Sequence, residues 1–583
     1  MVHRKTRWLR FSERTESRKM MNTLRSRTFA RAFSFLTIFF PILFFCFVAW
    51  RYCVDIPWFD DFEAFPVFLD RWLNAGSVWD KWLEIIRPNN EHRMVFGKLA
   101  VVVYYLFNKT LNFKYLQAVG ICFTLGTYSV FYRVIQRASL SSWYLLPISL
   151  LLFQFEHYLV YSWSICGLQH QPVIFFITLT SYLLARRYFY WAILAAICAN
   201  FSMSNGILVW VAGGGILILQ QEYKRLGFWF LTGISMIYLY LHDIPAMGNE
   251  SSVPYIIQHP VLTILGFFTF LGGIFDVLPT WPLNYRIILP IIAGVLGTII
   301  IMVWWLKLLG KWIKNQQLPN TNSELTYFIF GISIFLIVNA LIIAFLRPRF
   351  GFFVMLVSNY KLYPALFLVV LYVVLLCLQS SFISKKAILI VAAFVGSIIW
   401  LLSAFHSVNT LSEQRKMLVI NAYNQKMNGT GLGLPPNTRF SLYMDSVMNV
   451  LANKNIYHYP ITYKPIVEAI NKAGNTKFYN LPMIQNTEKS LTIVQQGRFH
   501  FDEFNGGIYI YFKSKYNLYV FKMDAVQYQG KNIFRTYSDV AQFTIDDYSN
   551  SFLTGEYLMG FVKVENDIVR AGQYGTISIP KFK

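Results

Sequence analysis

Two adjacent carboxylates, Asp60 and Asp61, lie in the stretch VDIPWFDDFEAF at residues 54–65, directly after the first long apolar run of the chain. A carboxylate beside a bilayer is costly, so the pair calls for an explanation. An aspartate that reaches an acceptor hydroxyl can act as a general base and remove its proton. The plainer interpretation is a helix cap, because Asp is favoured just before a helix and one could begin at Phe62.

Further polar side chains lie in RPNNEHR at 87–93, FEHYLVYSWSICGLQHQ at 155–171, FLRPRFG at 345–351 and SNYKLY at 358–363. We expect these stretches at the outer ends of different helices, where they could converge on one cavity. Carboxylates together with several cations suit a site that binds a phosphate and deprotonates a hydroxyl, since Arg offers two parallel N–H contacts to phosphate oxygens. The candidate substrate-binding residues are Glu91, His92, Arg93, His157, His170, Arg347, Arg349, Tyr360 and Lys361.

Each candidate also has a structural interpretation. Residues 91–93 could form a surface ion-pair cluster, and Arg347 and Arg349 could anchor lipid headgroups. His157 and His170 could be satisfied or interfacial histidines rather than ligands. No certain cofactor follows from the sequence. A divalent metal ion is left open, and its ligands would be Asp60, Asp61 and His92.

The composition places these residues in a membrane protein. The chain has 583 residues, of which 55% are hydrophobic and only 14% are charged. Its mean hydropathy is +0.43, far outside the range of an ordinary soluble enzyme. The net charge of +23 does not indicate a nucleic-acid partner, because the basic residues form small groups between apolar runs, as orientation signals do.

We expect about eleven membrane-spanning helices. The first is the run 32–50, which follows a basic arm that should stay in the cytoplasm. If the later basic clusters are also cytoplasmic, the chain alternates across the membrane and finishes outside. Two segments, 92–109 and 263–279, do not fit as spans and are predicted to be interfacial or re-entrant. The other expected spans are 115–134, 143–157, 171–185, 188–203, 206–221, 227–242, 286–306, 325–346, 362–380 and 387–405.

This topology places the acidic pair on the outer face, in a first loop at 51–114 that should lie along the membrane surface. The C-terminal region should be a small α+β or β-sandwich domain, because its apolar residues alternate with period two between Gly and Asn turns. The six cysteines form no disulfide framework, which favours a bacterial inner membrane. The predicted domains are a cytoplasmic arm at 1–31, an α-helical polytopic membrane domain at 32–405 and a strand-rich extracytoplasmic domain at 406–583.

The order of these features resembles the GT-C superfamily of polytopic glycosyltransferases. The shared features are the first helix, the acidic pair, the membrane-parallel loop, NEHR at 90–93, FSMSNGILVW at 201–210 and SNYKLY at 358–363. The resemblance covers about residues 32–405. It implies transfer of a sugar, with inversion, from a polyprenyl-phosphate donor to a hydroxyl of a glycan, lipid or protein acceptor.

The resemblance also implies roles for individual residues. Asp60 or Asp61 would be the catalytic base, and Arg or Lys would stabilise the leaving phosphate. A late Tyr preceded by Arg is commoner in that superfamily. Here Asn359 precedes Tyr360, which would move the phosphate contact to Lys361 or Arg347.

A polytopic transporter or flippase of lipid-linked glycans is the alternative function. A carrier binds near the middle of the membrane and often has interrupted helices there, whereas the charged residues of this chain gather at one face. A non-catalytic scaffold with an outer β-domain would leave the acidic pair without a role.

Overall fold

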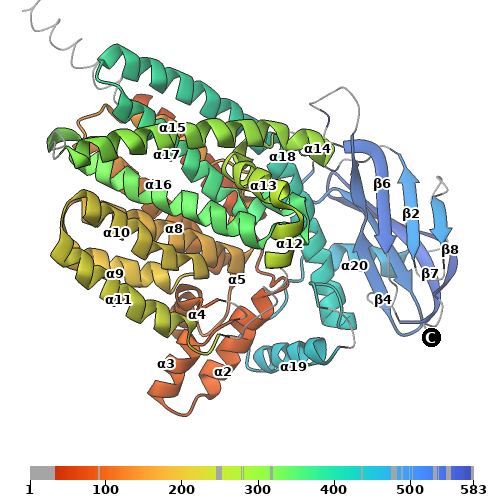
Figure 1. Ribbon diagram of the computed structural model, residues 1–583. Helices are drawn as coiled ribbons and strands as arrows, with labels where there is room; N and C mark the ends of the chain where they lie inside the picture. Colours follow the sequence, from red (N-terminus) through yellow and green to blue (C-terminus); the bar gives the residue numbers. More distant parts are fainter. Residues whose placement is uncertain are drawn as a thin grey trace, which may run out of the picture.

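A computed structural model describes residues 33–579, apart from 90–91, 245–251, 278, 280, 315–319, 435–437, 474–481, 488–489, 498, 500, 502, 529–534, 536 and 546–552. The described chain is mostly helical and carries a strand-rich region at one end of the helical part (Figure 1). The predicted arm at 1–31 lies outside the described residues. The predicted order of a helical part followed by a strand-rich part is confirmed.

Within the described residues, six helices are long and apolar enough to cross a membrane. The number of about eleven spans is therefore not confirmed, although every expected segment coincides with a helix. Several of the helices at the other expected spans are short. One longer helix, α8 (Ser164–Ala185), carries Gln and His side chains in its first turns. The six candidate spans are Phe33–Tyr52, Phe113–Arg137, Leu283–Ile313, Ser323–Leu346, Ser358–Leu378 and Phe382–Asn428.

Most helices of this part pack around one large apolar core, whereas α4 (Val95–Asn108) packs into a second, smaller one. Three short 3₁₀ turns, η6 (Pro348–Phe350), η7 (Phe352–Leu356) and η8 (Ser358–Tyr360), join α16 to α17. The remaining helices are α5 (Phe113–Arg137), α6 (Leu146–Leu152), α7 (Tyr158–Ser162), α9 (Phe189–Asn200), α10 (Val209–Leu219), α11 (Tyr223–Leu241), α12 (Ser252–Gln258), α13 (Pro260–Leu271), α14 (Leu283–Arg286), α15 (Ile288–Ile313), α16 (Asn320–Leu346) and α17 (Leu362–Leu378).

The predicted first outer loop at 51–114 contains α4 and the short helices α2 (Phe68–Asn74) and α3 (Val78–Ile86). A lysine of α4 completes the end of α3. The Lys98 Nζ donates to the backbone carbonyls of Glu84 and Arg87 at 3.0 and 2.7 Å. The last carbonyls of a helix lack partners within it, so a cation there is stabilising. This contact explains why a buried lysine interrupts the apolar face of α4.

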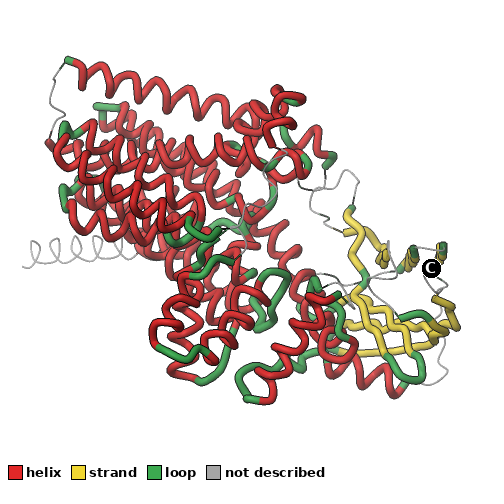
Figure 2. Tube along the Cα trace, turned by 60° about the horizontal axis from the view of Figure 1, so that its bottom comes forward, coloured by secondary structure: helices red, strands yellow, loops and turns green. Residues whose placement is uncertain are grey.

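The strands form two four-stranded antiparallel sheets, of order β1-β2-β6-β5 and β4-β3-β7-β8. Figure 2 shows the strands in yellow, gathered beside the helical part. Apolar side chains of both sheets meet in one core, where the ring centroids of Phe512 and Phe543 lie 5.8 Å apart. The prediction of a β-rich C-terminal region is thereby confirmed. The strands are β1 (Met483–Asn486), β2 (Leu491–Gln496), β3 (Gly507–Lys513), β4 (Leu518–Lys522), β5 (Asp524–Gln527), β6 (Tyr537–Ile545), β7 (Gly555–Glu565) and β8 (Ile568–Ile579).

One helix, α18 (Phe382–Asn428), joins the helical part to the sheets. It has 47 residues and continues unbroken through the predicted domain boundary at 405/406. Its last turns lie against β4, because the Asn424 side chain pairs with the backbone of Val520 through hydrogen bonds of 2.6 and 3.0 Å. The helices α19 (Arg439–Asn453) and α20 (Lys464–Lys472) follow before the first strand.

Candidate functional site

The acidic pair lies in a tight turn between the first helix and α2. Phe59 adopts a left-handed backbone with a φ of 46°, a conformation that is strained for a bulky residue. The buried Asp61 carboxylate accepts hydrogen bonds from the backbone N–H groups of Trp58 at 3.1 Å and Ile165 at 2.8 Å. Asp61 therefore holds the turn and ties it to α8, while Asp60 remains on the exposed side of the turn.

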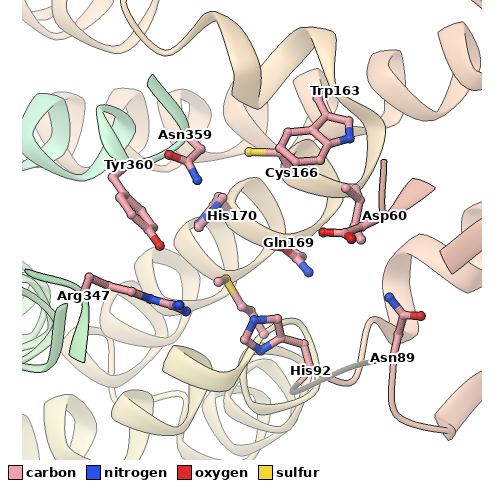
Figure 3. A pocket seen from close by; sticks show the side chains of 12 residues that line it. Asp60, Asn89, His92, Trp163, Cys166, Gln169, His170, Arg347, Asn359 and Tyr360 are labelled. Atoms are coloured by element: carbon pink, nitrogen blue, oxygen red, sulfur yellow. The ribbon is translucent and has the colours of Figure 1, made fainter. Parts of the chain in front are cut away.

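Asp60 lines a cavity of about 470 Å³. Arg347, which follows α16, lies on the opposite side of this cavity, and His92 and His170 lie between the two (Figure 3). Tyr360 of η8 also faces it. The stretches around residues 60, 92, 170, 347 and 360 thus converge on one cavity, as their expected place at the outer helix ends predicted. The other lining residues are Asn89, Trp163, Ile165, Cys166, Gln169, Met203 and Asn359.

The two ends of this cavity differ in charge. The buried Nε of Arg347 has no hydrogen-bond partner among the described residues, and its guanidinium carbon lies 5.9 Å from the centroid of the Phe350 ring. Arg347 is half-buried, and no ion pair holds its guanidinium among the described residues, so this end favours an anionic ligand. At the other end, desolvation raises the pKa of Asp60 above its ordinary value. A raised pKa makes a carboxylate a stronger base.

A hydrogen-bonded chain orients His170 in the wall of the cavity. The His170 Nδ1 lies 2.8 Å from the Tyr363 hydroxyl, which also accepts a hydrogen bond from the Asn205 side-chain amide at 2.8 Å. In one of the two possible arrangements, the tyrosine donates its proton to Nδ1 of the imidazole. In that arrangement the neutral ring carries its own proton on Nε2, where it can be donated to a ligand oxygen.

Arg93, a predicted substrate-binding residue, does not line the cavity. Its guanidinium donates to the backbone carbonyls of Tyr240 at 2.7 Å and Ile86 at 2.5 Å, and also to that of His242. These bonds tie the end of α3 to the end of α11. The geometry gives Arg93 a structural task.

Two other predicted residues also lie away from the cavity, and a third lies outside the described residues. His157 is fully buried, with its Nδ1 2.9 Å from the Gln154 amide nitrogen. The Arg349 guanidinium lies over the Phe350 ring at 4.6 Å and does not line the cavity. Glu91 lies outside the described residues.

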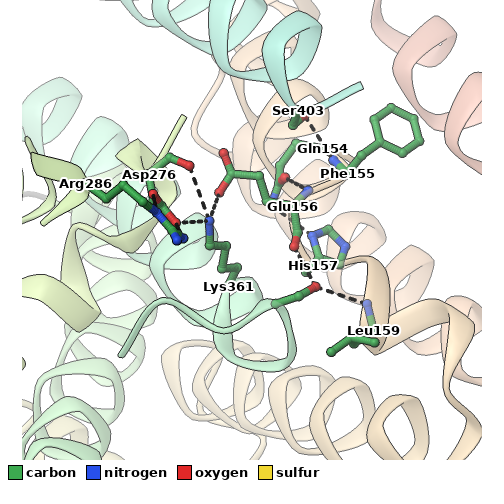
Figure 4. A network of polar contacts seen from close by, with 10 residues as sticks. Gln154, Phe155, Glu156, His157, Leu159, Asp276, Arg286, Lys361 and Ser403 are labelled. Carbon is green, nitrogen blue, oxygen red and sulfur yellow. Dashed lines mark hydrogen bonds and ion pairs between the residues drawn. The ribbon is translucent and has the colours of Figure 1, made fainter. Parts of the chain in front are cut away.

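Lys361 faces a different part of the molecule from its neighbour Tyr360. Its Nζ lies 2.9 Å from a carboxylate oxygen of Glu156 and 3.0 Å from one of Asp276 (Figure 4). Arg286 in turn makes two bonds of 2.9 and 2.7 Å to the Asp276 carboxylate. Two acids and two bases thus form one buried network, and the charge of Lys361 is already balanced there.

Sequence reasoning named Glu156 as an outer polar residue but overlooked Asp276 and Arg286. Asp276 offered one signal, since it is a single acid in the apolar stretch TILGFFTFLGGIFDVLP, which did not fit the membrane-spanning pattern. Its partner Lys361 lies 85 residues away in the chain, so no local pattern could reveal the pair.

The residues proposed for a metal ion do not come together. Among the described residues, no three His, Cys, Asp or Glu side chains are placed to hold a metal ion. Asp61 is engaged by backbone amides, and Asp60 and His92 lie apart on the cavity wall. The donor set does not fit a metal, so the chemistry below is derived from protein groups alone.

No family model, curated protein or solved structure matches this chain. The proposal for its function therefore rests on the residues of the cavity and on their arrangement.

A glycine-rich turn, GTGLGL at 429–434, supports the acidic pair from the end of α18. The Phe59 N–H donates to the carbonyl of Leu432 at 3.0 Å. Gly433 has a φ of +88°, and a Cβ atom there would overlap the Phe59 ring. This glycine is required both by its backbone conformation and by the close approach of the ring.

Gly433→Ala should displace Phe59 and loosen the acidic turn. Loss of the Phe59 hydrogen bond, worth about 1 kcal/mol, should speed hydrogen exchange at that amide by roughly fivefold. Gly429→Ala is the matched control, because Gly429 also has a positive φ of +65° but its Cβ would face Asp445. Hydrogen-exchange mass spectrometry on residues 58–62 gives the measurement. Equal exchange in both variants would mean that Gly433 does not support the turn.

Proposed function

We propose that the protein is a membrane glycosyltransferase of the GT-C type, which moves a sugar from a polyprenyl-phosphate donor to a hydroxyl of a glycan, lipid or protein acceptor. The observation that carries this proposal is the opposition of Asp60 and Arg347 across one cavity. An inverting displacement needs a base on the attacking side and a cation on the leaving side. The volume of about 470 Å³ is in the range of small-molecule sites.

The proposed reaction is a single displacement. The acceptor oxygen attacks the anomeric carbon of the donor sugar while Asp60 takes the hydroxyl proton. A new C–O bond forms, the bond between the anomeric carbon and the phosphate oxygen breaks, and its electrons leave with the polyprenyl phosphate. Arg347 stabilises the negative charge that develops on this phosphate, and the Nε2–H of His170 adds a hydrogen bond. The configuration at the anomeric carbon is inverted.

The membrane helices suit such a donor, because an isoprenoid tail needs an apolar environment beside the site. In this proposal the cavity opens on the outer face of a bacterial inner membrane, with the N-terminus in the cytoplasm and the β-rich region outside. The bilayer and the lipid-linked donor are then the partners of the helical part. A transporter of lipid-linked glycans would use the same anionic ligand, but it would not need a base at Asp60.

Arg347→Ala should weaken the binding of undecaprenyl phosphate to the purified protein by about 10- to 150-fold, since a hydrogen bond to a charged group is worth roughly 1.5–3 kcal/mol. Arg349→Ala is the control, because it removes the same charge two residues away and outside the cavity. Equilibrium binding of the radiolabelled lipid in detergent measures both. Equal loss in the two variants, or no binding to the wild type, would contradict the assigned phosphate site.

A further inference from the structure

We propose that a second cavity in this protein binds a neutral sugar residue of the acceptor; this inference rests on the proposed glycosyl transfer. The cavity has a volume of about 350 Å³ and is lined by the Glu156–Lys361–Asp276–Arg286 network, by α18 and by Gln527 of β5. The short segment 358–361 separates it from the first cavity. Asn359 and Tyr360 face the first cavity, whereas Ser358 and Lys361 face the second.

One wall of the second cavity is a polar stripe on an apolar helix. Ser403, His406, Ser407 and Thr410 of α18 all line it, and their spacing of three and four residues places them on one helix face. The buried Nδ1 of His406 has no hydrogen-bond partner among the described residues. This unpartnered nitrogen and the polar helix face around it indicate a polar occupant.

The opposite wall carries two acidic and two basic side chains, so its net charge is zero. This balance of charge distinguishes between the possible classes of ligand. A phosphate would compete with Glu156 and Asp276 for Lys361 and Arg286, which would leave buried carboxylates without partners. An alkyl chain would leave the buried Nδ1 of His406 without a hydrogen bond. A sugar hydroxyl can donate to a carboxylate and accept from a cation at once, so it fits the network without breaking it.

The remaining lining also suits a sugar. Tyr158 and Phe353 supply aromatic surface, on which the apolar face of a sugar ring can pack. Gln527 is the contribution of the β-rich region, and its amide can both donate and accept. An acceptor glycan would thus contact the strands and the helical part together. Its next residue would lie across the segment 358–361, toward Asp60.

Saturation-transfer NMR on the full-length protein in detergent tests the proposal, with glucose, galactose and N-acetylglucosamine as probes. We expect a transfer signal from at least one probe, with a Kd on the order of 1–10 mM, that inorganic phosphate does not suppress. Thr410→Trp and Ser407→Trp should each abolish the signal by filling the cavity. Leu401→Trp is the control, because Leu401 lies on the exposed side of α18 and does not line the cavity.

Gln169→Trp, which fills the first cavity, should leave the sugar signal intact. The proposal is overturned if no probe gives a signal, if Thr410→Trp retains it, if phosphate suppresses it, or if only Gln169→Trp removes it. These results are separate from the test of the proposed function. A protein that binds sugar here but does not transfer would disprove the transferase, whereas transfer without this signal would disprove the second site alone.

Discussion

Replacing Asp60 by Asn should abolish sugar transfer while leaving the protein folded and able to bind undecaprenyl phosphate. Asn keeps the shape of the side chain but cannot accept the acceptor proton, and loss of a general base costs on the order of 10²–10⁴ in rate. Asp60 lies on the exposed side of its turn, with its side chain at the cavity, so the change should alter stability little. The assay measures transfer from undecaprenyl-phosphate-linked sugars in detergent. Normal transfer by Asp60→Asn would show that Asp60 is not the base, whereas no transfer by the wild type would favour a transporter.

Asp61→Asn is the matched control, and it should fail in a different way. Both carboxylate oxygens of Asp61 accept backbone N–H groups. The side-chain amide of Asn can accept a hydrogen bond from only one of these N–H groups, and its own NH₂ group would face the other N–H. A buried donor without a partner costs about 1–3 kcal/mol, so Asp61→Asn should lower the melting temperature. A fully stable but inactive Asp61→Asn variant would instead make Asp61 the base.

The pH dependence of transfer gives a second readout of Asp60. A base must be unprotonated to act, so kcat/KM should fall as the pH falls through the pKa of Asp60. Desolvation raises that pKa. The acidic limb of the pH profile, where kcat/KM falls, should therefore have its midpoint above the pKa near 4 of an ordinary aspartate. The limb should be absent from the residual activity of Asp60→Asn.

Lys361→Met should destabilise the protein by about 3–5 kcal/mol, because removal of one partner leaves a buried charge uncompensated. The Lys361 and Glu156 side chains are only 8% and 7% exposed, and Lys361 is the partner of Glu156 in the network. Adding Glu156→Gln should restore most of the lost stability, since the ion pair of Asp276 and Arg286 then remains complete. Unfolding in denaturing detergent, followed by tryptophan fluorescence, measures the cycle.

The same cycle separates two roles for Lys361. A lysine that binds donor phosphate would lose lipid affinity on substitution, without loss of stability and without rescue by Glu156→Gln. A lysine that holds the network would show the opposite pattern. The network predicts the second outcome, together with unchanged binding of undecaprenyl phosphate after rescue.

The convergence of the polar stretches could be predicted from the sequence, because alternating basic clusters fix which helix ends share a face. The same pattern predicts that Asp60, His170 and Arg347 lie together, and all three line one cavity. The sequence pattern could not show that Tyr360 and Lys361 face different cavities. Side chains of consecutive residues in a 3₁₀ turn point in directions about 120° apart. The sequence pattern also grouped Arg93 with the site, because pairing with the carbonyls of α11 depends on tertiary contacts alone.

The number of spans was less predictable for a related reason. Hydropathy marks apolar segments but not their lengths as helices, and segments such as α9 and α10 end after 12 and 11 residues. The boundary at 405/406 followed the change from apolar to polar composition. The helix α18 continues across that change, because its polar part finds partners such as the backbone of β4.

The unbroken course of α18 has a consequence for the lipid environment. At 1.5 Å per residue its 47 residues extend roughly 70 Å, more than twice the hydrocarbon thickness of about 30 Å. If its apolar half lies in the membrane, the inclination of the other half follows that of the inserted half, because the helix is unbroken. A thinner bilayer tilts a long helix further, and this tilt would swing the β-rich region and the GTGLGL turn together. Bilayer thickness would then be coupled mechanically to the position of the acidic turn, which contacts GTGLGL through Phe59.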